Sequence, residues 1–301
     1  MTTFNTLKKS TNQLSRLNKE IEKLKSPTFE KKTDDRFWKP DIDKAGNGSA
    51  VIRFLPTPAV DGEDAFPWIR LFSHSFKGPT GKWYIENSLS TPVPGFPKGK
   101  PDPLGELNTQ LWNAVDDDNS PQRKQARFQK RKLSFYSNIY VVSDPKRPQN
   151  EGKVFLYRYG KKIFDKILLT MNPEFEGDAE INPFDLWKGA NFRLRIRSVE
   201  GYPNYDQSSF ASPGPLLEND DALEKVFNSE HSLQTFLAPE QFKSYTQLKS
   251  HLETVMGNSL VTAPEPAGYT PKAKAAAIKA QLEDDTTDDD DEFAKFKALA
   301  E

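Results

Sequence analysis

The chain has 301 residues, of which 36% are hydrophobic and 28% are charged, and its formal net charge is −1 at pH 7. The absence of cysteine excludes disulfides and zinc sites built on thiolates. No run of about 18 apolar residues occurs, which excludes a membrane-spanning helix, and the N-terminus lacks the apolar segment of a secretory signal, so we expect a cytoplasmic protein.

The net charge hides an uneven distribution along the chain. Eight acidic residues and no basic ones lie between Glu283 and Glu292, and removing these eight charges from the total of −1 leaves +7. A split of this kind indicates that the basic part contacts nucleic acid and that a separate acidic tail follows it.

Residues 1–26 predict a helical arm. Its apolar positions recur at helical spacing and are Leu14, Leu17, Ile21 and Leu24. Pro27 ends the helix, and a helix this short is only marginally stable in water. Its apolar stripe therefore needs a partner, either the rest of the chain or a neighbouring molecule.

Residues 27–257 predict a β-rich domain with inserted helices. Short apolar segments bounded by turn residues indicate the strands Ala50–Leu55, Trp83–Glu86, Ser134–Val142, Val154–Tyr159 and Phe192–Val199. Loop residues from Asp144 to Gly152 indicate a hairpin, and Thr91–Gly105 reads as an irregular loop. Late helices are expected at 221–227 and 239–255. We expect an α+β fold on a five-stranded oligonucleotide-binding (OB) barrel with helical additions, with a β-sandwich as the alternative.

Residues 258–301 predict a disordered acidic tail, because the segment is rich in Pro, Ala and Gly and then in acids. Phe293, Phe296 and Leu299 follow the acids at helical spacing. We expect them to form a short amphipathic helix on a protein partner. A tail that only raises solubility is the alternative.

A dense basic cluster precedes the predicted strand Ser134–Val142. Its cations are Arg123, Lys124, Arg127, Lys130, Arg131 and Lys132. Phe135 and Tyr136 follow directly. Cations attract phosphates and aromatic faces stack on bases, which favours a nucleic-acid surface over the alternative of a solvated helix face.

The segment Lys153–Tyr159 places three aromatic rings on one face of a strand by alternation, namely Phe155, Tyr157 and Tyr159. Arg158, Lys161 and Lys162 flank them. Two interpretations remain open, in which the rings either pack in the core or stack on bases.

The segment from Phe192 to Arg197 alternates more cleanly. Phe192, Leu194 and Ile196 are expected to face the core, whereas the opposite face carries cations about 6.8 Å apart, namely Arg193, Arg195 and Arg197. Like charges repel, so an anion is expected over them, and a phosphate suits guanidinium geometry best. Tyr202 and Tyr205 follow in a turn where exposed rings are expected.

Catalytic candidates are weak. Asp144, Glu151 and Lys153 loosely match the Asp…Glu-x-Lys pattern of metal-dependent nucleases, but turn composition accounts for all three. No phosphate-cradling glycine loop and no Ser-His-Asp spacing stands out. We expect no enzymatic activity and no cofactor.

Several stretches make the chain similar to the T-even bacteriophage single-stranded DNA-binding, or helix-destabilising, proteins. They are Ala45–Pro56, Gly81–Glu86, Asn150–Ile167, Gly189–Phe192 and Gly201–Asp206. The resemblance implies a self-association arm, an OB core for single-stranded DNA, and an acidic tail that recruits phage replication and recombination proteins. It implies a role in replication, recombination and repair in an infected bacterial cell. A single-stranded RNA-binding regulator on the same barrel is the alternative.

The resemblance also assigns a short basic-hydroxyl motif. In the arm it corresponds to Lys8, Lys9, Ser10 and Thr11, and it implies that the arm docks on a neighbouring copy. A second copy corresponds to Lys130–Ser134, where Leu133 stands in place of a hydroxyl residue.

One departure concerns zinc, which the family's type member holds with one histidine and three cysteines. His74 matches the histidine, but Ser88 stands where the first cysteine is expected and the proline-rich loop Thr91–Pro103 replaces the other two. One histidine cannot hold structural zinc, so we expect no metal. The subdomain near residues 60–125 is then expected to be held by the rings of Phe72, Phe76, Trp83 and Tyr84.

Overall fold

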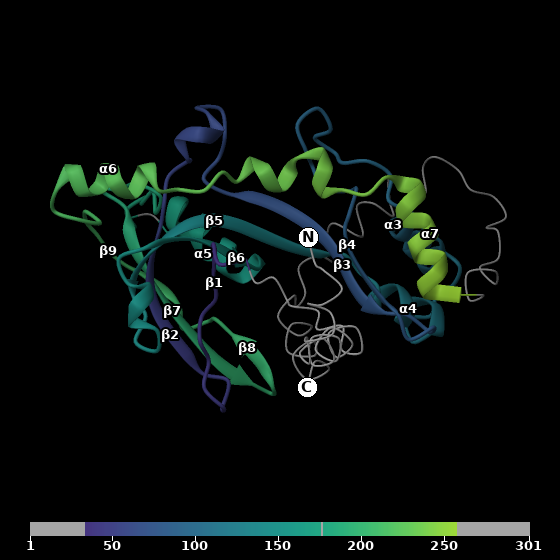
Figure 1. Cartoon of the computed structure of the whole chain (residues 1–301). Helices are drawn as coiled ribbons and strands as arrows, with labels where there is room; N and C mark the ends of the chain where they lie inside the picture. The colour runs from purple at the N-terminus through teal and green to yellow at the C-terminus, as the bar shows by residue number, and fades with distance from the viewer. Residues whose placement is uncertain (1–33, 176, 258–301) are drawn as a thin grey trace, which may run out of the picture. The chain divides into compact units, whose positions relative to one another are not determined.

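A computed structural model describes residues 34–175 and 177–257, so the predicted arm and acidic tail lie outside the described residues. The chain divides into two units, Met1–Asp35 and Arg36–Glu301. The fold below is that of the second unit up to Gly257 (Figure 1).

A nine-stranded sheet organises the described part of this unit. Its main path runs β1-β6-β5-β2-β7-β8, while β3 pairs with β4 and β5, and β9 pairs with β7. The strands are β1 (Phe37–Trp38), β2 (Gly48–Phe54), β3 (Ile69–Lys77), β4 (Trp83–Asn87), β5 (Lys132–Ser143), β6 (Val154–Tyr159), β7 (Ala190–Val199), β8 (Tyr202–Asn204) and β9 (Ser209–Pro213).

The long strand β5 connects the two ends of the sheet. Its first residues pair with β3, its middle with β6 and its last residues with β2, all antiparallel. Tyr136 lies opposite Ile69, and Ile139 lies opposite Phe54. One continuous strand therefore contributes to both the β3–β4 end and the β2–β7 end.

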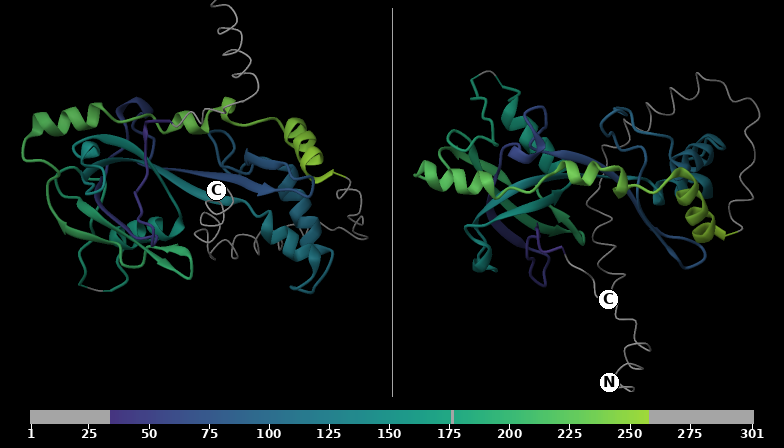
Figure 2. Two further views of the ribbon diagram at one scale, coloured as in Figure 1. Left: turned by 60° about the horizontal axis from the view of Figure 1, so that its bottom comes forward. Right: turned by 45° about the horizontal axis from the view of Figure 1, so that its top comes forward.

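Five α-helices accompany the sheet in the described residues, and they are α3 (Pro103–Asn113), α4 (Pro121–Phe128), α5 (Lys161–Met171), α6 (Asp220–Asn228) and α7 (Tyr245–Met256). Proline at the first helical position follows a side-chain cap in α3 (Asp102) and α4 (Ser120). Figures 1 and 2 show α3, α4 and α7 beside β3 and β4, with α6 at the opposite end. None of the helices so described is long and apolar enough to cross a membrane.

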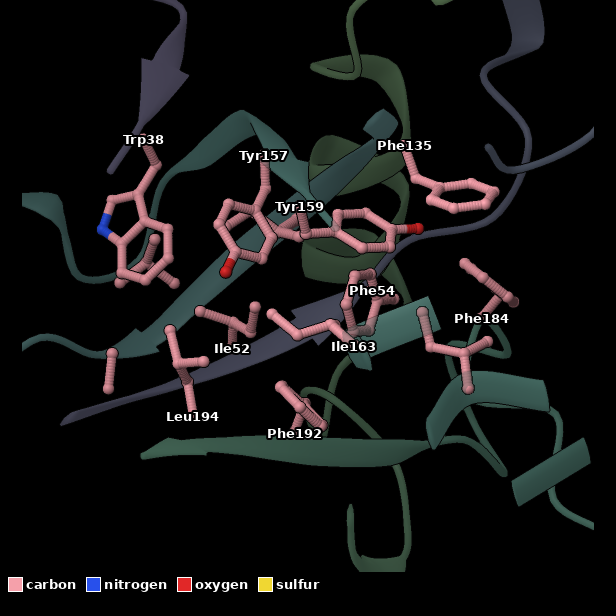
Figure 3. Packing of buried hydrophobic residues seen from close by; sticks show 14 of the residues in the cluster. Trp38, Ile52, Phe54, Phe135, Tyr157, Tyr159, Ile163, Phe184, Phe192 and Leu194 are labelled. Carbon is pink, nitrogen blue, oxygen red and sulfur yellow. The ribbon is translucent and has the colours of Figure 1, made fainter. Parts of the chain in front are cut away.

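The main core lies between β2, β5, β6, β7 and α5 (Figure 3). The ring of Phe54 lies 5.5 Å from that of Tyr159 and 5.8 Å from that of Phe192, measured between centroids. Phe135 stacks on Phe164 of α5 at 3.8 Å. A second core lies under β3 and β4, where Phe76 and Tyr84 pack with apolar residues of α3 and α7.

A buried arginine ties β2 to β7 and to the segments that precede β7 and follow β9. Arg53 is only 1% exposed. Its guanidinium donates to Asn191 Oδ1 at 2.9 Å, to the Asp185 carbonyl at 2.9 Å and to the Gly214 carbonyl at 2.8 Å. Gly189 is required beside it, because a Cβ there would lie 2.2 Å from the Asp185 carbonyl oxygen. This arginine therefore fixes where β7 begins.

The α+β class and all five expected strands are confirmed, as are the hairpin between β5 and β6 and the late helices near α6 and α7. The predicted irregular loop Thr91–Gly105 extends three residues too far, because Pro103–Gly105 form the first turn of α3. The sequence interpretation missed the strands β1, β3, β8 and β9 and the helices α3, α4 and α5, and Tyr202, which was expected in a turn, lies in β8. No strand pair among the described residues closes a five-stranded barrel, so the barrel stays a prediction.

A partly buried acid, Glu230, follows α6. Both of its carboxyl oxygens are buried without a hydrogen-bond partner among the described residues, and burial together with nearby Asp61 raises its pKa to about 9. The pKa in the folded chain is above the unfolded value, so this group's contribution to stability is most favourable at low pH. It becomes less favourable as pH rises from about 4.5 toward about 9.

Glu230→Gln should therefore raise the free energy of unfolding at pH 8 by about 1–3 kcal/mol, allowing for partial exposure, and leave it nearly unchanged at pH 4. Urea unfolding at both pH values measures this. The exposed Glu224→Gln on α6 is the control. An equal effect of Glu230→Gln at the two pH values would contradict the assignment.

Candidate nucleic-acid interface

The predicted alternation of β7 is confirmed. Phe192, Leu194 and Ile196 are buried, and the three arginines between and after them are exposed. We call these exposed side chains, Arg193, Arg195 and Arg197, the β7 arginine face. None of them forms an ion pair with an acidic side chain within the part of the chain that the structure describes. Their charge is therefore available to an outside anion.

A hollow of about 630 Å³ lies at the β7 arginine face, where β7 pairs with β2. Its lining combines guanidinium groups with small polar residues, namely Asn47, Gly48, Ser49, Arg195, Ile196, Arg197, Ser198 and Gln207. Buried Ser208 fixes the backbone here, because its hydroxyl accepts from the Arg195 N–H at 2.9 Å and donates to the Arg195 carbonyl at 3.0 Å. The hollow offers both charge and hydrogen-bond donors to a phosphate.

Four aromatic residues that were candidates for base stacking lie in the core instead. The expected surface position of Phe135 and Tyr136 is wrong, and of the two interpretations of Tyr157 and Tyr159 the core packing is the one observed. Phe135, Tyr136, Tyr157 and Tyr159 are 5%, 8%, 3% and 4% exposed. Phe155, Tyr157 and Tyr159 lie on the face of β6 that packs against the main core, and Tyr159 is hydrogen-bonded to Ser137 at 2.9 Å. Burial accordingly raises the pKa of the Tyr159 hydroxyl.

The predicted basic cluster divides into two groups with different roles. Arg123 and Arg127 of α4 pair with Asp118 at 2.6 and 3.2 Å, and both guanidinium groups lie over the ring of Trp112. They hold the loop between α3 and α4 and are mainly structural. Lys124 is exposed on the same helix. The pairing could have been predicted from the three aspartates at 116–118, which lie just before the cluster in the sequence.

The remaining cations of the cluster lie at the start of β5. Arg131 lies over the ring of Phe72 at 4.0 Å and donates to Ser90 Oγ at 2.9 Å. Lys130 and Lys132 are partly buried beside it. Strand β3 runs next to this segment and places exposed Arg70 opposite Phe135. Arg70 was missed because β3 was missed, although Ile69 and Leu71 alternate with Arg70 as a strand requires.

The cations around β6 and α5 are individually engaged. Exposed Arg158 donates from Nε to Ser134 Oγ at 2.9 Å, and Lys161 pairs with Asp165 at 2.7 Å. Lys162 is partly buried. Tyr202 and Tyr205 are also partly buried rather than fully exposed, and Tyr205 packs against the main core.

A family profile described as "gp32 DNA binding protein like" matches residues 46–256. The chain is 36% identical to the single-stranded DNA-binding proteins of Enterobacteria phages T2 and T4 over 259 residues, which are 85% of this chain and 78% of each relative. It is 52% identical over 54 residues to the single-stranded DNA-binding protein of Escherichia phage SV14, covering 18% of this chain and 44% of that one. The chain belongs to the gp32-like family.

This gp32-like chain has no cysteine, and its described residues do not fit the zinc that the resemblance implies. No group of three or more His, Asp or Glu side chains comes together at metal-binding distance within residues 34–175 and 177–257. Ser88 donates its hydroxyl hydrogen to Asp102 Oδ2 at 2.9 Å, beside buried His74. The expected packing of Phe76 and Tyr84 in this subdomain is confirmed and Phe72 is buried as well, whereas Trp83 is only partly buried and lies outside this core.

We call Asp144, Glu151 and Lys153, which match the nuclease pattern, the nuclease-like triplet, and its two acids form the hydrogen bonds of a turn. Asp144 accepts from Trp38 Nε1 at 2.9 Å and from Asn150 Nδ2 at 3.1 Å, and Glu151 accepts from the Asp144 N–H at 2.7 Å. Lys153 is exposed. These contacts confirm the turn interpretation of both acids. The predicted self-association motif Lys8–Thr11 lies outside the described residues.

Proposed function

We propose that this gp32-like protein binds single-stranded DNA with little sequence preference and catalyses no reaction. The observation that carries the proposal is the β7 arginine face, which lies beside a polar hollow and has no acidic partner within the described residues. Contacts to phosphate carry no sequence information, and a guanidinium binds phosphate through two parallel hydrogen bonds. The names of the T2 and T4 relatives support the same ligand.

The contacts we propose are those cations that the fold leaves on the surface. They are the β7 arginine face, the exposed Arg70, Lys124 and Arg158, and the partly exposed Arg131. Because four predicted rings are buried, base stacking falls to partly exposed rings such as Tyr202. Charge then supplies a larger share of the affinity than stacking, and binding should depend strongly on salt.

The proposal also assigns a fold to the core and a role to each of the two terminal segments. We propose that β2, β5, β6 and β7 belong to an OB barrel, that residues 1–26 mediate cooperative binding to neighbouring copies through Lys8–Thr11, and that residues 258–301 recruit replication and recombination proteins. The acidic composition of the last segment and the resemblance to the T-even phage proteins support these roles. The setting we propose is the cytoplasm of an infected bacterial cell.

A salt titration with an oligo-dT strand tests the proposal. With about five phosphates contacted, the slope of log K against log salt should be about −3.5, so affinity should fall about a hundredfold from about 50 to 200 mM salt. Filter binding or fluorescence anisotropy across that range measures it. A slope near zero would contradict the proposal.

The same assay separates the other functions. Oligo-U of equal length should bind more weakly than oligo-dT, and preferential binding of oligo-U would favour an RNA-binding regulator. Labelled DNA incubated with magnesium should remain intact, because the acids of the nuclease-like triplet are engaged in a turn. Cleavage that is lost in Asp144→Asn would instead establish a nuclease.

A further inference from the structure

One carboxylate, that of Asp102, joins three parts of the β3–β4 subdomain. It is 5% exposed and begins α3, where its Oδ1 accepts from the N–H groups of Leu104 at 3.1 Å and Gly105 at 3.0 Å. Its Oδ2 accepts from the Ser88 hydroxyl at 2.9 Å and from the Leu89 N–H at 3.0 Å. Helix α3 and the segment after β4 are therefore bound to the same group.

The third part is β3, through His74. Its Nε2 lies 3.4 Å from Asp102 Oδ1, farther than a short hydrogen bond, and its Nδ1 lies 3.3 Å from the Gln129 carbonyl oxygen. Burial alone would raise the pKa of Asp102, but His74 and the donors Gly105 and Ser88 lower it to about 2. Asp102 is thus a permanent buried anion at neutral pH.

A row of hydroxyls leads from this anion toward the surface. The hydrogen of the Ser88 hydroxyl points to Asp102, so in the 2.9 Å contact between the Ser88 and Ser90 hydroxyls Ser90 must be the donor. The Ser90 oxygen is then left to accept from Arg131 Nη1 at 2.9 Å. The direction of every hydrogen bond from Arg131 to Asp102 is thereby determined.

Each end of this row carries a charge, and charge strengthens a hydrogen bond. The anion polarises Ser88, Ser88 orients Ser90, and Ser90 presents its lone pair to the guanidinium. The ring of Phe72, 4.0 Å from the Arg131 guanidinium, supports it from a second direction. Arg131 is therefore held in one orientation before any ligand arrives.

We propose that Asp102 takes the place of the family's zinc ion as the group that unites this subdomain, and that it positions Arg131 for phosphate through Ser88 and Ser90. Ser88 stands where the first cysteine ligand is expected, and His74 matches the histidine ligand. A carboxylate bound by five neighbouring groups thus occupies the place of a cation bound by four side chains. The proposal thus has a structural half, in which Asp102 unites the subdomain, and a positioning half, in which it orients Arg131. The positioning half rests on the proposed binding of single-stranded DNA.

Ser90→Ala tests the positioning half, because Ser90 is partly exposed and outside the two cores. Affinity for oligo-dT should fall about three- to fivefold and the salt slope should become shallower by up to about 0.7, the value of one phosphate contact. The melting temperature should not change. Ser90→Thr should restore binding, and the exposed Ser250→Ala on α7 is the matched control.

The decisive comparison places Ser90→Ala in an Arg131→Gln background. We expect no further loss of affinity there, because the only role of Ser90 in binding is to hold Arg131. An equal loss in both backgrounds, or no loss in either, overturns the positioning role. If the wild-type chain does not bind oligo-dT at all, the proposed function fails together with this half, whereas the structural half is tested independently.

The structural half is tested by metal removal and by Asp102→Asn. Dialysis of the full chain against a chelator should leave the melting temperature unchanged, and metal analysis should find no stoichiometric zinc. Asp102→Asn should lower the melting temperature markedly, and added zinc should not restore it. Stoichiometric zinc, or an Asp102→Asn chain as stable as wild type, overturns the proposal.

Discussion

Replacing Arg195 and Arg197 together with glutamine should weaken binding to oligo-dT about 25-fold at about 0.1 M salt, with almost no effect at about 1 M. Each phosphate contact to a single strand contributes about 0.7 to the salt slope, so two contacts contribute about 1.4, or about 25-fold over a tenfold change in salt. The double variant should therefore show a slope about 1.4 shallower than wild type. Both side chains are exposed, so the fold should not change.

A matched control removes two positive charges elsewhere. Lys225 of α6 and Lys249 of α7 are exposed and lie away from the β7 arginine face in sequence and in strand pairing. Their double replacement by glutamine should change affinity less than twofold. Equal losses in the two double variants would mean that net charge alone, rather than the arrangement on β7, governs binding.

The second large effect concerns stability. Arg53→Met should lower the free energy of unfolding by about 3–5 kcal/mol, because it removes a buried guanidinium that donates to three partly buried acceptors, on Asp185, Asn191 and Gly214. Methionine keeps much of the aliphatic volume, so the loss reports the hydrogen bonds rather than a cavity. Urea unfolding at neutral pH measures it.

The control for this prediction is Arg70→Met, since Arg70 is an exposed arginine on another strand of the same sheet. Its effect on stability should stay within about 0.5 kcal/mol. A loss for Arg53→Met of the same small size would show that water replaces the guanidinium at the three acceptors, and that Arg53 does not anchor β7.

Alternation and turn chemistry were sufficient to predict β2, β4, β5, β6 and β7, since each is a short apolar run between turn residues. The missing elements had weaker local signals. Strand β3 contains His74 and two serines among its apolar residues, and the N-cap of helix α5 is Gly160, which has no side chain to cap it. Their places are set by packing against residues far away in the sequence, such as Phe164 against Phe135.

The candidate site was predictable only where a sequence pattern allows a single placement of its side chains, in the core or at the surface. Three arginines that alternate with Phe192, Leu194 and Ile196 cannot all be buried, so the exposure of the β7 arginine face followed from the sequence. An aromatic row has two solutions, and only the fold shows that Tyr157 and Tyr159 enter the main core. Arg123 and Arg131 are equally basic in sequence, yet one binds Asp118 and the other binds Ser90.

The continuous strand β5 also fixes a length. It has 12 residues without proline or glycine, so it extends about 40 Å at about 3.4 Å per residue. Its first residue adjoins Arg131, and its last residues lie against β2, the neighbour of the β7 arginine face. No loop interrupts it, so the distance between its two ends is fixed. The cations near its two ends are therefore kept at a set spacing, whether or not a ligand is bound.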